Sequence, residues 1–219
     1  FVAAGKPKPA LTYLDRLATF VESNAVLDGA KVHAFRAHLL KGGARAAAYQ
    51  KALAYNPSDL ESLRELGLHY LQDRNVAQAL PLLQEALVQE PSDRKALFGL
   101  AQIHFATGDL RSAIKTLRIL TQHHPDHASA VNNLAWILAT HTDDDLRDGP
   151  EARRLARTLP VETHPAYADT LAAALAETGA FEEALEVINR VLPGAKGSFL
   201  KDLRQRRRAY QQRKPWRSK

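Results

Sequence analysis

The sequence predicts an all-α fold in which helical hairpins follow one another along the chain and a last helix caps them. Three observations carry this prediction. Pro57, Pro91 and Pro125 recur at a spacing of 34 residues, and each is followed by two apolar patterns of helical period with a break between them. The chain also contains no cysteine, so disulfide frameworks and cysteine-based metal sites are excluded. The repeating unit is therefore a hairpin of two helices.

The N-terminal part of the chain is expected to hold a linker, a single helix and a short hairpin. Residues 1–9 contain Pro7 and Pro9 beside lysines and predict an extended linker. Residues 10–29 predict one amphipathic helix, which is the second half of an earlier unit. Residues 30–59 predict a hairpin with a turn shortened by two glycines. Because the chain opens at Phe1, we expect N-terminal processing or a longer parent chain.

Residues 60–93 carry the clearest hairpin. The apolar positions of its two helices, at helical spacing, are Leu63, Leu66, Gly67 and Tyr70, then Ala79, Leu83 and Ala86. The small residues among them allow two helix backbones to approach closely, while the leucines and the tyrosine fill the space around them. Pro91 then ends the second helix, because it cannot continue the hydrogen-bond ladder.

Residues 94–127 repeat this arrangement, with two departures from it at His104 and Leu120. The conserved spacing of its members is seen at Leu97, Leu100, Ala101, Gly108, Ala113 and Leu117. With its period of 34 residues and its closing proline, the pattern resembles the tetratricopeptide repeat family. The resemblance implies a right-handed α–α superhelix of stacked hairpins, with a concave groove that binds extended peptides or partner helices.

Two further units and a cap are expected towards the C-terminus. In residues 128–164 the turn is lengthened by ATHTDDDLRDGP before the second helix resumes at Glu151. Residues 165–197 carry the next hairpin. Residues 198–219 predict a basic helix and tail with Phe199, Leu203 and Tyr210 on one stripe. Such a helix suits the end of a solenoid, where the last apolar face must be covered.

The resemblance also implies which side chains line the groove, on faces of the first helices that the hairpin core does not use. These are Arg64, Leu68, Phe98, Gln102, Phe105, Asn132, Asn133 and Trp136. Large apolar groups on a free face favour a recognition surface, and carboxamides can bond a peptide backbone. The alternative is that Phe105 and Trp136 fill the seams between neighbouring units.

One subset of the family grips a C-terminal carboxylate with lysine and asparagine at fixed groove positions. The corresponding pairs in this chain are Arg64 with Leu68 and Phe98 with Gln102. The clamp is not reproduced. We therefore expect a more apolar protein segment as the ligand, rather than an acidic C-terminal tail.

Candidates for chemistry are few. His123, His124 and His127 lie together in the turn HHPDH and form a weak candidate metal site with Asp126. The sister turns read YNPSD and QEPSD, which favours ordinary polar turn residues. No phosphate loop, nucleophile elbow, zinc-protease motif or dinucleotide motif is present. The sequence therefore predicts no enzyme, no cofactor and no small-molecule substrate.

The positive charge is concentrated at the C-terminus. Residues 201–219 hold nine Lys or Arg and one Asp, a net charge of +8, so residues 1–200 carry −2 of the total of +6. The candidates for binding a polyanion, such as nucleic acid or an anionic membrane surface, are Arg204, Arg206, Arg207, Arg208 and Arg213. A single basic helix on a slightly acidic chain favours the other interpretation, the solvated face of a cap.

These features predict a non-catalytic scaffold or adaptor that binds a partner protein or peptide segment. The segments NNLAWILAT and YADTLAAALAETGAFEEALEVI resemble the C-terminal repeats of bacterial multi-repeat proteins, several of which serve envelope or exopolysaccharide-assembly systems. Three alternatives are polyanion binding, a role as the assembly or regulatory portion of a larger enzyme, and self-association through the tail around Pro215 and Trp216. No run of 18 apolar residues occurs, so a soluble segment is expected, and cytoplasm and periplasm both fit.

Overall fold

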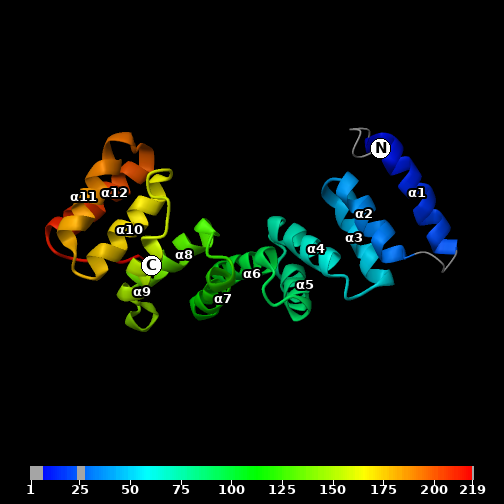
Figure 1. The fold of residues 1–219 in the computed structure, drawn as a ribbon, viewed down its shortest axis with the longest axis horizontal. Coiled ribbons are helices and arrows are strands. Elements are labelled where there is room, and N and C mark those ends of the chain that lie inside the picture. The colour runs from blue at the N-terminus through cyan, green and yellow to red at the C-terminus, as the bar shows by residue number, and fades with distance from the viewer. Residues whose placement is uncertain (1–6, 24–27, 219) are drawn as a thin grey trace. The chain divides into compact units, whose positions relative to one another are not determined.

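Twelve α-helices and two short 3₁₀ helices make up the part of the chain that the computed structural model describes, residues 7–23 and 28–218. The predicted all-α fold is confirmed, with helices packed in pairs. The chain forms two compact units (Figure 1), the first ending at Gly108 and the second beginning at Asp109. None of the helices in the described residues is both long and apolar enough to cross a bilayer.

The first unit holds the helices up to α6. They are α1 (Pro7–Ser23), α2 (Gly29–Leu39), α3 (Gly42–Tyr55), α4 (Leu60–Gln72), α5 (Val76–Gln89) and α6 (Arg94–Thr107). Extensive contacts join α2 to α3 and α4 to α5, and further contacts join α3 to α4 and α5 to α6.

The second unit holds the remaining helices. They are α7 (Leu110–His123), α8 (Ala128–Thr140), η1 (Asp144–Leu146), α9 (Gly149–Ala156), α10 (Pro165–Glu177), α11 (Phe181–Val191), η2 (Leu192–Gly194) and α12 (Gly197–Gln211). The lengthened turn between α8 and α9 contains η1.

The start of α1 corrects one prediction. Residues 7–9 were expected in an extended linker, but α1 begins at Pro7. Proline is tolerated in the first turn of a helix, because the N–H group that it lacks would have no acceptor within the helix. The remainder of the predicted linker, residues 1–6, lies outside the described residues.

The 34-residue period acts on both ends of the helices. Asp59, Asp93 and Asp109 each precede a helix and accept a hydrogen bond from the backbone N–H three residues later, at 2.8–3.1 Å. At the other end, α3, α5 and α7 stop two residues before the recurring prolines. Proline disfavours helical geometry in the residue before it, so each helix ends there.

Two glycines determine how closely the helices of the first unit approach Leu83, which is fully buried on α5. A Cβ atom added to Gly67 of α4 would lie 2.9 Å from Leu83 Cδ2. One added to Gly99 of α6 would lie 3.0 Å from Leu83 Cδ1 and 2.9 Å from Leu68 Cδ2. The leucine therefore fills space that the missing side chains leave between α4, α5 and α6.

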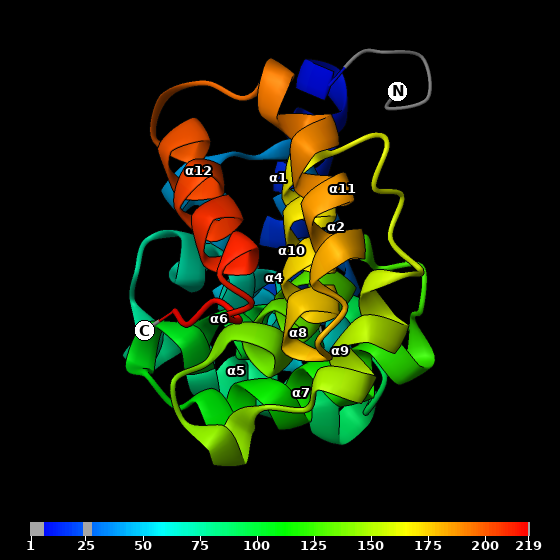
Figure 2. The same cartoon turned by 90° about the vertical axis from the view of Figure 1, so that its left-hand side faces the viewer.

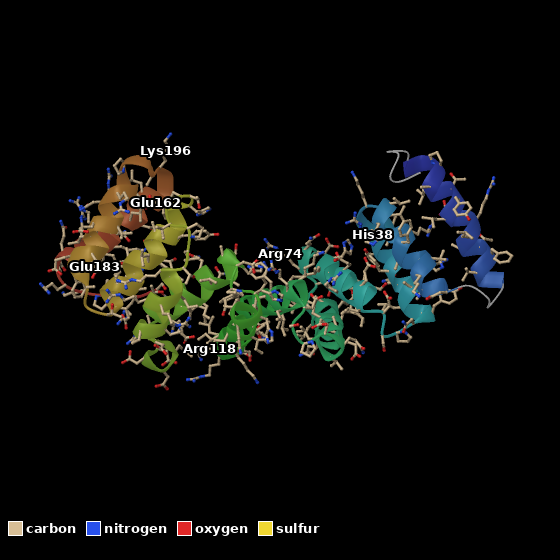
Figure 3. All side chains as sticks on the ribbon, in the orientation of Figure 1. His38, Arg74, Arg118, Glu162, Glu183 and Lys196 are labelled. Carbon is tan, nitrogen blue, oxygen red and sulfur yellow. The ribbon has the colours of Figure 1, made fainter. Side chains whose placement is uncertain are left out.

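Replacing Arg74 with glycine is expected to raise the free energy of unfolding by about 0.5–1 kcal/mol. Arg74 (labelled in Figure 3) follows α4 with a φ of 58°, and Gly108, which stands 34 residues later, has a φ of 76° in the equivalent turn. A Cβ atom is strained in this left-handed conformation, and the relief of that strain exceeds the entropy that glycine adds to the unfolded chain. Urea-induced unfolding followed by circular dichroism measures the change.

The neighbouring substitution Asp73→Gly is the control, because Asp73 has a φ of −80° and gains no relief from glycine. Equal effects of the two substitutions would contradict the strain argument.

In the second unit α12 packs against α11 and covers an apolar surface. Figure 2 shows α10, α11 and α12 running side by side, in agreement with the contacts between them. Leu203 and Tyr210 of α12 are fully buried in a cluster with Ala172, Ala184 and Ile188. An apolar stripe on an otherwise basic helix thus packs inward, while most of the arginines lie outward.

Candidate functional site

A cavity of about 260 Å³ in the second unit is lined by side chains from three helices. Its lining residues are Asn132, Asn133 and Trp136 of α8, Ala166, Asp169 and Thr170 of α10, and Arg206 of α12. The structure therefore brings three of the predicted groove residues together, beside an ion pair. A concave site with an aromatic wall and a few convergent polar groups is typical of ligand-binding sites.

Arg206 lies at the centre of the cluster and is only 9% exposed. Its guanidinium carbon lies 4.9 Å from the centre of the Trp136 ring and 5.4 Å from that of Trp216. Its Nη1 atom lies 2.9 Å from Asp169 Oδ2. Cation–π contacts on two sides and a carboxylate on another hold the guanidinium in place. The prediction that Arg206 is available on an exposed basic face is therefore wrong.

Three buried polar atoms of this cluster have no hydrogen-bond partner among the described residues. They are Asp169 Oδ1, Arg206 Nε and the hydroxyl of Tyr210. Buried polar atoms are nearly always hydrogen-bonded, so unpaired ones beside a cavity can serve as contacts for a ligand. Next to them, Thr170 Oγ1 donates to Asn132 Oδ1 at 2.7 Å, which leaves the amide group of Asn132 available as a donor.

The ionisation of Asp169 is controlled by its surroundings. Burial raises the pKa of its carboxyl group to about 6, against the attraction of Arg206, and the negative charge of Asp202 raises it further. Burial likewise raises the pKa of the Tyr210 hydroxyl above its ordinary value. Asp169 is therefore a buried group that changes charge near pH 6.

Asp169→Asn is expected to remove a pH dependence of stability that the wild-type chain shows between about pH 4 and pH 6. The folded chain retains the proton of Asp169 to about pH 6, whereas the unfolded chain releases it near its model value of 3.8. The folded state binds the proton more tightly, so raising the pH through this window lowers the free energy of unfolding, by roughly 3 kcal/mol. Urea-induced unfolding of both chains at pH 4 and pH 7 measures the difference.

Glu186→Gln, which removes an exposed carboxylate of α11, is the control. If the stabilities of the wild type and Asp169→Asn changed in parallel from pH 4 to pH 7, Asp169 would not be the titrating group.

In the first unit, two predicted groove residues contribute to packing. Arg64 Nη1 lies 2.8 Å from Asp93 Oδ2, and Arg64 Nε donates to Glu65 Oε1, which also accepts from Lys95 Nζ at 2.7 Å. These contacts tie α4 to the start of α6. Leu68 occupies the space above Gly99 and so fills a seam between helices.

The other predicted groove residues of the first unit lie on one face of α6. Their spacing of four and three residues places Phe98, Gln102 and Phe105 along a single stripe. Gln102 is exposed, and the two phenylalanines are partly buried.

The spacing of α12 contains a signal for Arg206 that sequence reasoning missed. Arg206 follows Leu203 by three residues and precedes Tyr210 by four, so it lies on the stripe that was expected to face inward. Its positive charge argued for an exposed position. The buried carboxylate that pairs with it, Asp169, is distant in sequence.

The remaining basic candidates differ in their surroundings. Arg213 Nη1 lies 3.1 Å from Glu182 Oε1, and its guanidinium stacks over Phe181. Arg204, Arg207 and Arg208 are exposed on α12.

The histidine cluster in the turn after α7 takes part in helix ends. His127 occupies the position that Asp59 and Asp93 hold in the preceding units, and its Nδ1 atom accepts a hydrogen bond from the backbone N–H of Ala130 at 3.3 Å. His124 follows the last residue of α7. Within residues 7–23 and 28–218, no group of three histidine or carboxylate side chains is arranged to hold a metal ion.

Comparisons with known proteins identify a repeat family. One family model described as tetratricopeptide repeat matches residues 70–137, and a second with the same description matches residues 34–94. The chain is 28% identical over 207 residues to cellulose synthase operon protein C of Pseudomonas fluorescens (strain SBW25), which covers 86% of this chain. It spans only 16% of the length of that relative.

Two solved structures share the fold. YrrB, a TPR protein with an unusual peptide-binding site, has a TM-score of 0.65 at 16% identity, and the match covers 89% of this chain and 95% of that one. A tetratricopeptide repeat protein from Parabacteroides merdae has a TM-score of 0.62 at 16% identity, with 97% and 83% covered.

Proposed function

This chain is a tetratricopeptide repeat protein, and on that premise we propose that it is a non-catalytic scaffold that binds an extended segment of a partner protein. The observation that carries the proposal is the cavity of the second unit, where Asn133 and Trp136 lie beside the unpaired Asp169 Oδ1. An indole face offers apolar area, and carboxamides can donate to and accept from a peptide backbone whatever its side chains are.

The face of α6 supports the same function for the first unit. Phe98, Gln102 and Phe105 combine partly buried rings with an exposed carboxamide. Aromatic side chains dominate the energetics of many protein interfaces. We propose this stripe as a second binding surface.

Capture of partners from the native organism tests the proposal. Immobilised wild-type chain is compared with Asn133→Ala/Trp136→Ala and, separately, with Phe98→Ala/Phe105→Ala. Lys115→Ala, which changes an exposed residue of α7, is the matched control. A partner that the wild type and the control retain, and that either pair variant loses while its helicity is unchanged, supports the scaffold. Equal recovery by all four chains would contradict both surfaces.

The similarity to cellulose synthase operon protein C supports a more specific setting. We propose that the chain serves a bacterial envelope or exopolysaccharide-assembly system as a portion of a longer repeat array. An alternative is the assembly or regulatory portion of a larger enzyme. The complete reading frame distinguishes these proposals, because a catalytic domain in the same frame would favour the alternative.

The exposed face of α12 favours one further candidate function. Arg204, Arg207 and Arg208 place three guanidinium groups on one helix, which is suited to phosphate groups of nucleic acid or an anionic membrane. Binding to DNA or acidic vesicles at low salt, lost on replacement of the three by glutamate, would support it. Absence of binding by the wild type at low salt would exclude it.

A further inference from the structure

The last residues of the chain fold back onto the second unit instead of continuing the direction of α12 (Figure 1, red). Arg213 turns the chain with a φ of 55°, and Lys214 N–H donates to the carbonyl of Ala209 at 3.0 Å. Residues 216–218 then reach three groups from three helices: Thr140 at the end of α8, Glu177 at the end of α10 and Arg206 of α12. We call these three groups the tail site.

Each residue of the tail makes a different kind of contact with the tail site. The Trp216 ring stacks on the Arg206 guanidinium at 5.4 Å, and the Arg217 Nη1 atom lies 2.6 Å from Glu177 Oε2. The Ser218 N–H donates to the carbonyl of Thr140 at 2.8 Å, which pairs an extended strand with a backbone carbonyl at a helix end.

The hydroxyl contact has a defined direction. The Thr140 hydroxyl donates to the carbonyl of Trp136 at 2.8 Å, so the Ser218 hydroxyl is the donor in its contact of 2.6 Å with Thr140 Oγ1. The third position of the tail is thus read by both its backbone and its hydroxyl group.

The receiving groups are held in place by contacts of their own. Glu177 is 12% exposed at its side chain and accepts from Arg147 Nε at 3.0 Å through its other oxygen. Arg206 is held by Trp136 and Asp169 as described above. Preorganised partners reduce the entropic cost of binding, so this surface is suited to an incoming segment.

We propose that the tail site recognises an extended segment with an aromatic residue, an arginine and a serine or threonine in succession, and that residues 216–218 occupy it as an intramolecular ligand. A partner segment of this pattern binds by displacing the tail. This inference deepens the proposed scaffold function, because it gives the chemistry of the partner at the α8, α10 and α12 end of the second unit.

A short tail is a displaceable occupant. Each neutral hydrogen bond contributes only about 0.5–1.5 kcal/mol net, and segments near a chain end open at low free energy. The tether gives the tail an effective concentration on the order of millimolar, so a free peptide competes poorly until the tail is disabled.

A labelled synthetic peptide of residues 213–218, RKPWRS, is the probe. It is titrated by fluorescence anisotropy into the full-length wild type and into the full-length tail variant Trp216→Ala/Arg217→Ala/Ser218→Ala. We expect at least tenfold tighter binding to the variant, as the loss of a tethered competitor requires. The control peptide RKPAES should not bind, and Glu177→Gln in the tail variant should weaken the binding of RKPWRS.

Several results would overturn the proposal. These are equal binding to both chains, no binding to the variant at millimolar peptide, or binding of the control peptide as well. A wild-type dimer in light scattering that the tail variant does not form would place the tail in a second copy and reject the intramolecular ligand. If the tail variant lost helicity, Ser218→Pro, which removes the donor N–H alone, would replace it. Failure here leaves the capture experiment at Asn133 and Trp136 unaffected, so the two proposals fail separately.

Discussion

Replacing Leu83 with alanine is expected to lower the free energy of unfolding by about 3–5 kcal/mol. Leu83 is fully buried, and it occupies the space above Gly67 and Gly99. These glycines have no side chain that could turn into the vacated volume, so the cavity closes only if whole helices move. The cost therefore lies in the upper part of the range for leucine-to-alanine substitutions. Urea-induced unfolding followed by circular dichroism measures it.

Val88→Ala provides the control on the same helix. Val88 is 70% exposed, so its replacement is expected to change the free energy of unfolding by no more than about 0.5 kcal/mol. A small effect of Leu83→Ala, comparable to that of Val88→Ala, would mean that α4, α5 and α6 do not share this packing.

Replacing Arg206 with alanine is expected to lower the free energy of unfolding by about 3–5 kcal/mol at pH 7, because it leaves the Asp169 carboxylate buried without its cation. The loss of the stack between Trp136 and Trp216 adds to this effect. The cost should be smaller at pH 5, where Asp169, whose pKa is already raised to about 6 by burial, takes up a proton.

The adjacent substitution Arg207→Ala is the control for charge. Arg207 is exposed, so a change of the same charge there is expected to have little effect on stability at either pH. Equal destabilisation by the two substitutions, or a cost of Arg206→Ala that is the same at pH 5 and pH 7, would contradict the buried ion pair.

The predicted site was partly right in composition and incomplete in its connections. Helical spacing identified Asn132, Asn133 and Trp136 as residues on a common face of α8, and they line one cavity. Spacing along one helix cannot show which distant side chains complete a site. Asp169 and Arg206 pair across 37 residues of sequence, and the contact depends on how α12 lies against the rest of the second unit.

The predicted role of Arg64 illustrates the opposite error. A cation on the free face of a first helix was expected to meet a ligand, but Arg64 reaches the Asp93 carboxylate at the start of the next first helix. Long side chains satisfy the nearest opposite charge, and that charge is known only when neighbouring units are stacked.

The sequence by itself determined the hairpins and their ends, because these follow from local rules. Apolar residues at helical spacing define the faces, an acidic or amide side chain caps each start, and proline after each second helix prevents its continuation. The tertiary structure alone decided which polar groups are buried together and where the tail lies. Arg206 became part of a cavity, and Trp216, Arg217 and Ser218 met three helices, because burial and pairing depend on contacts between residues far apart in the chain.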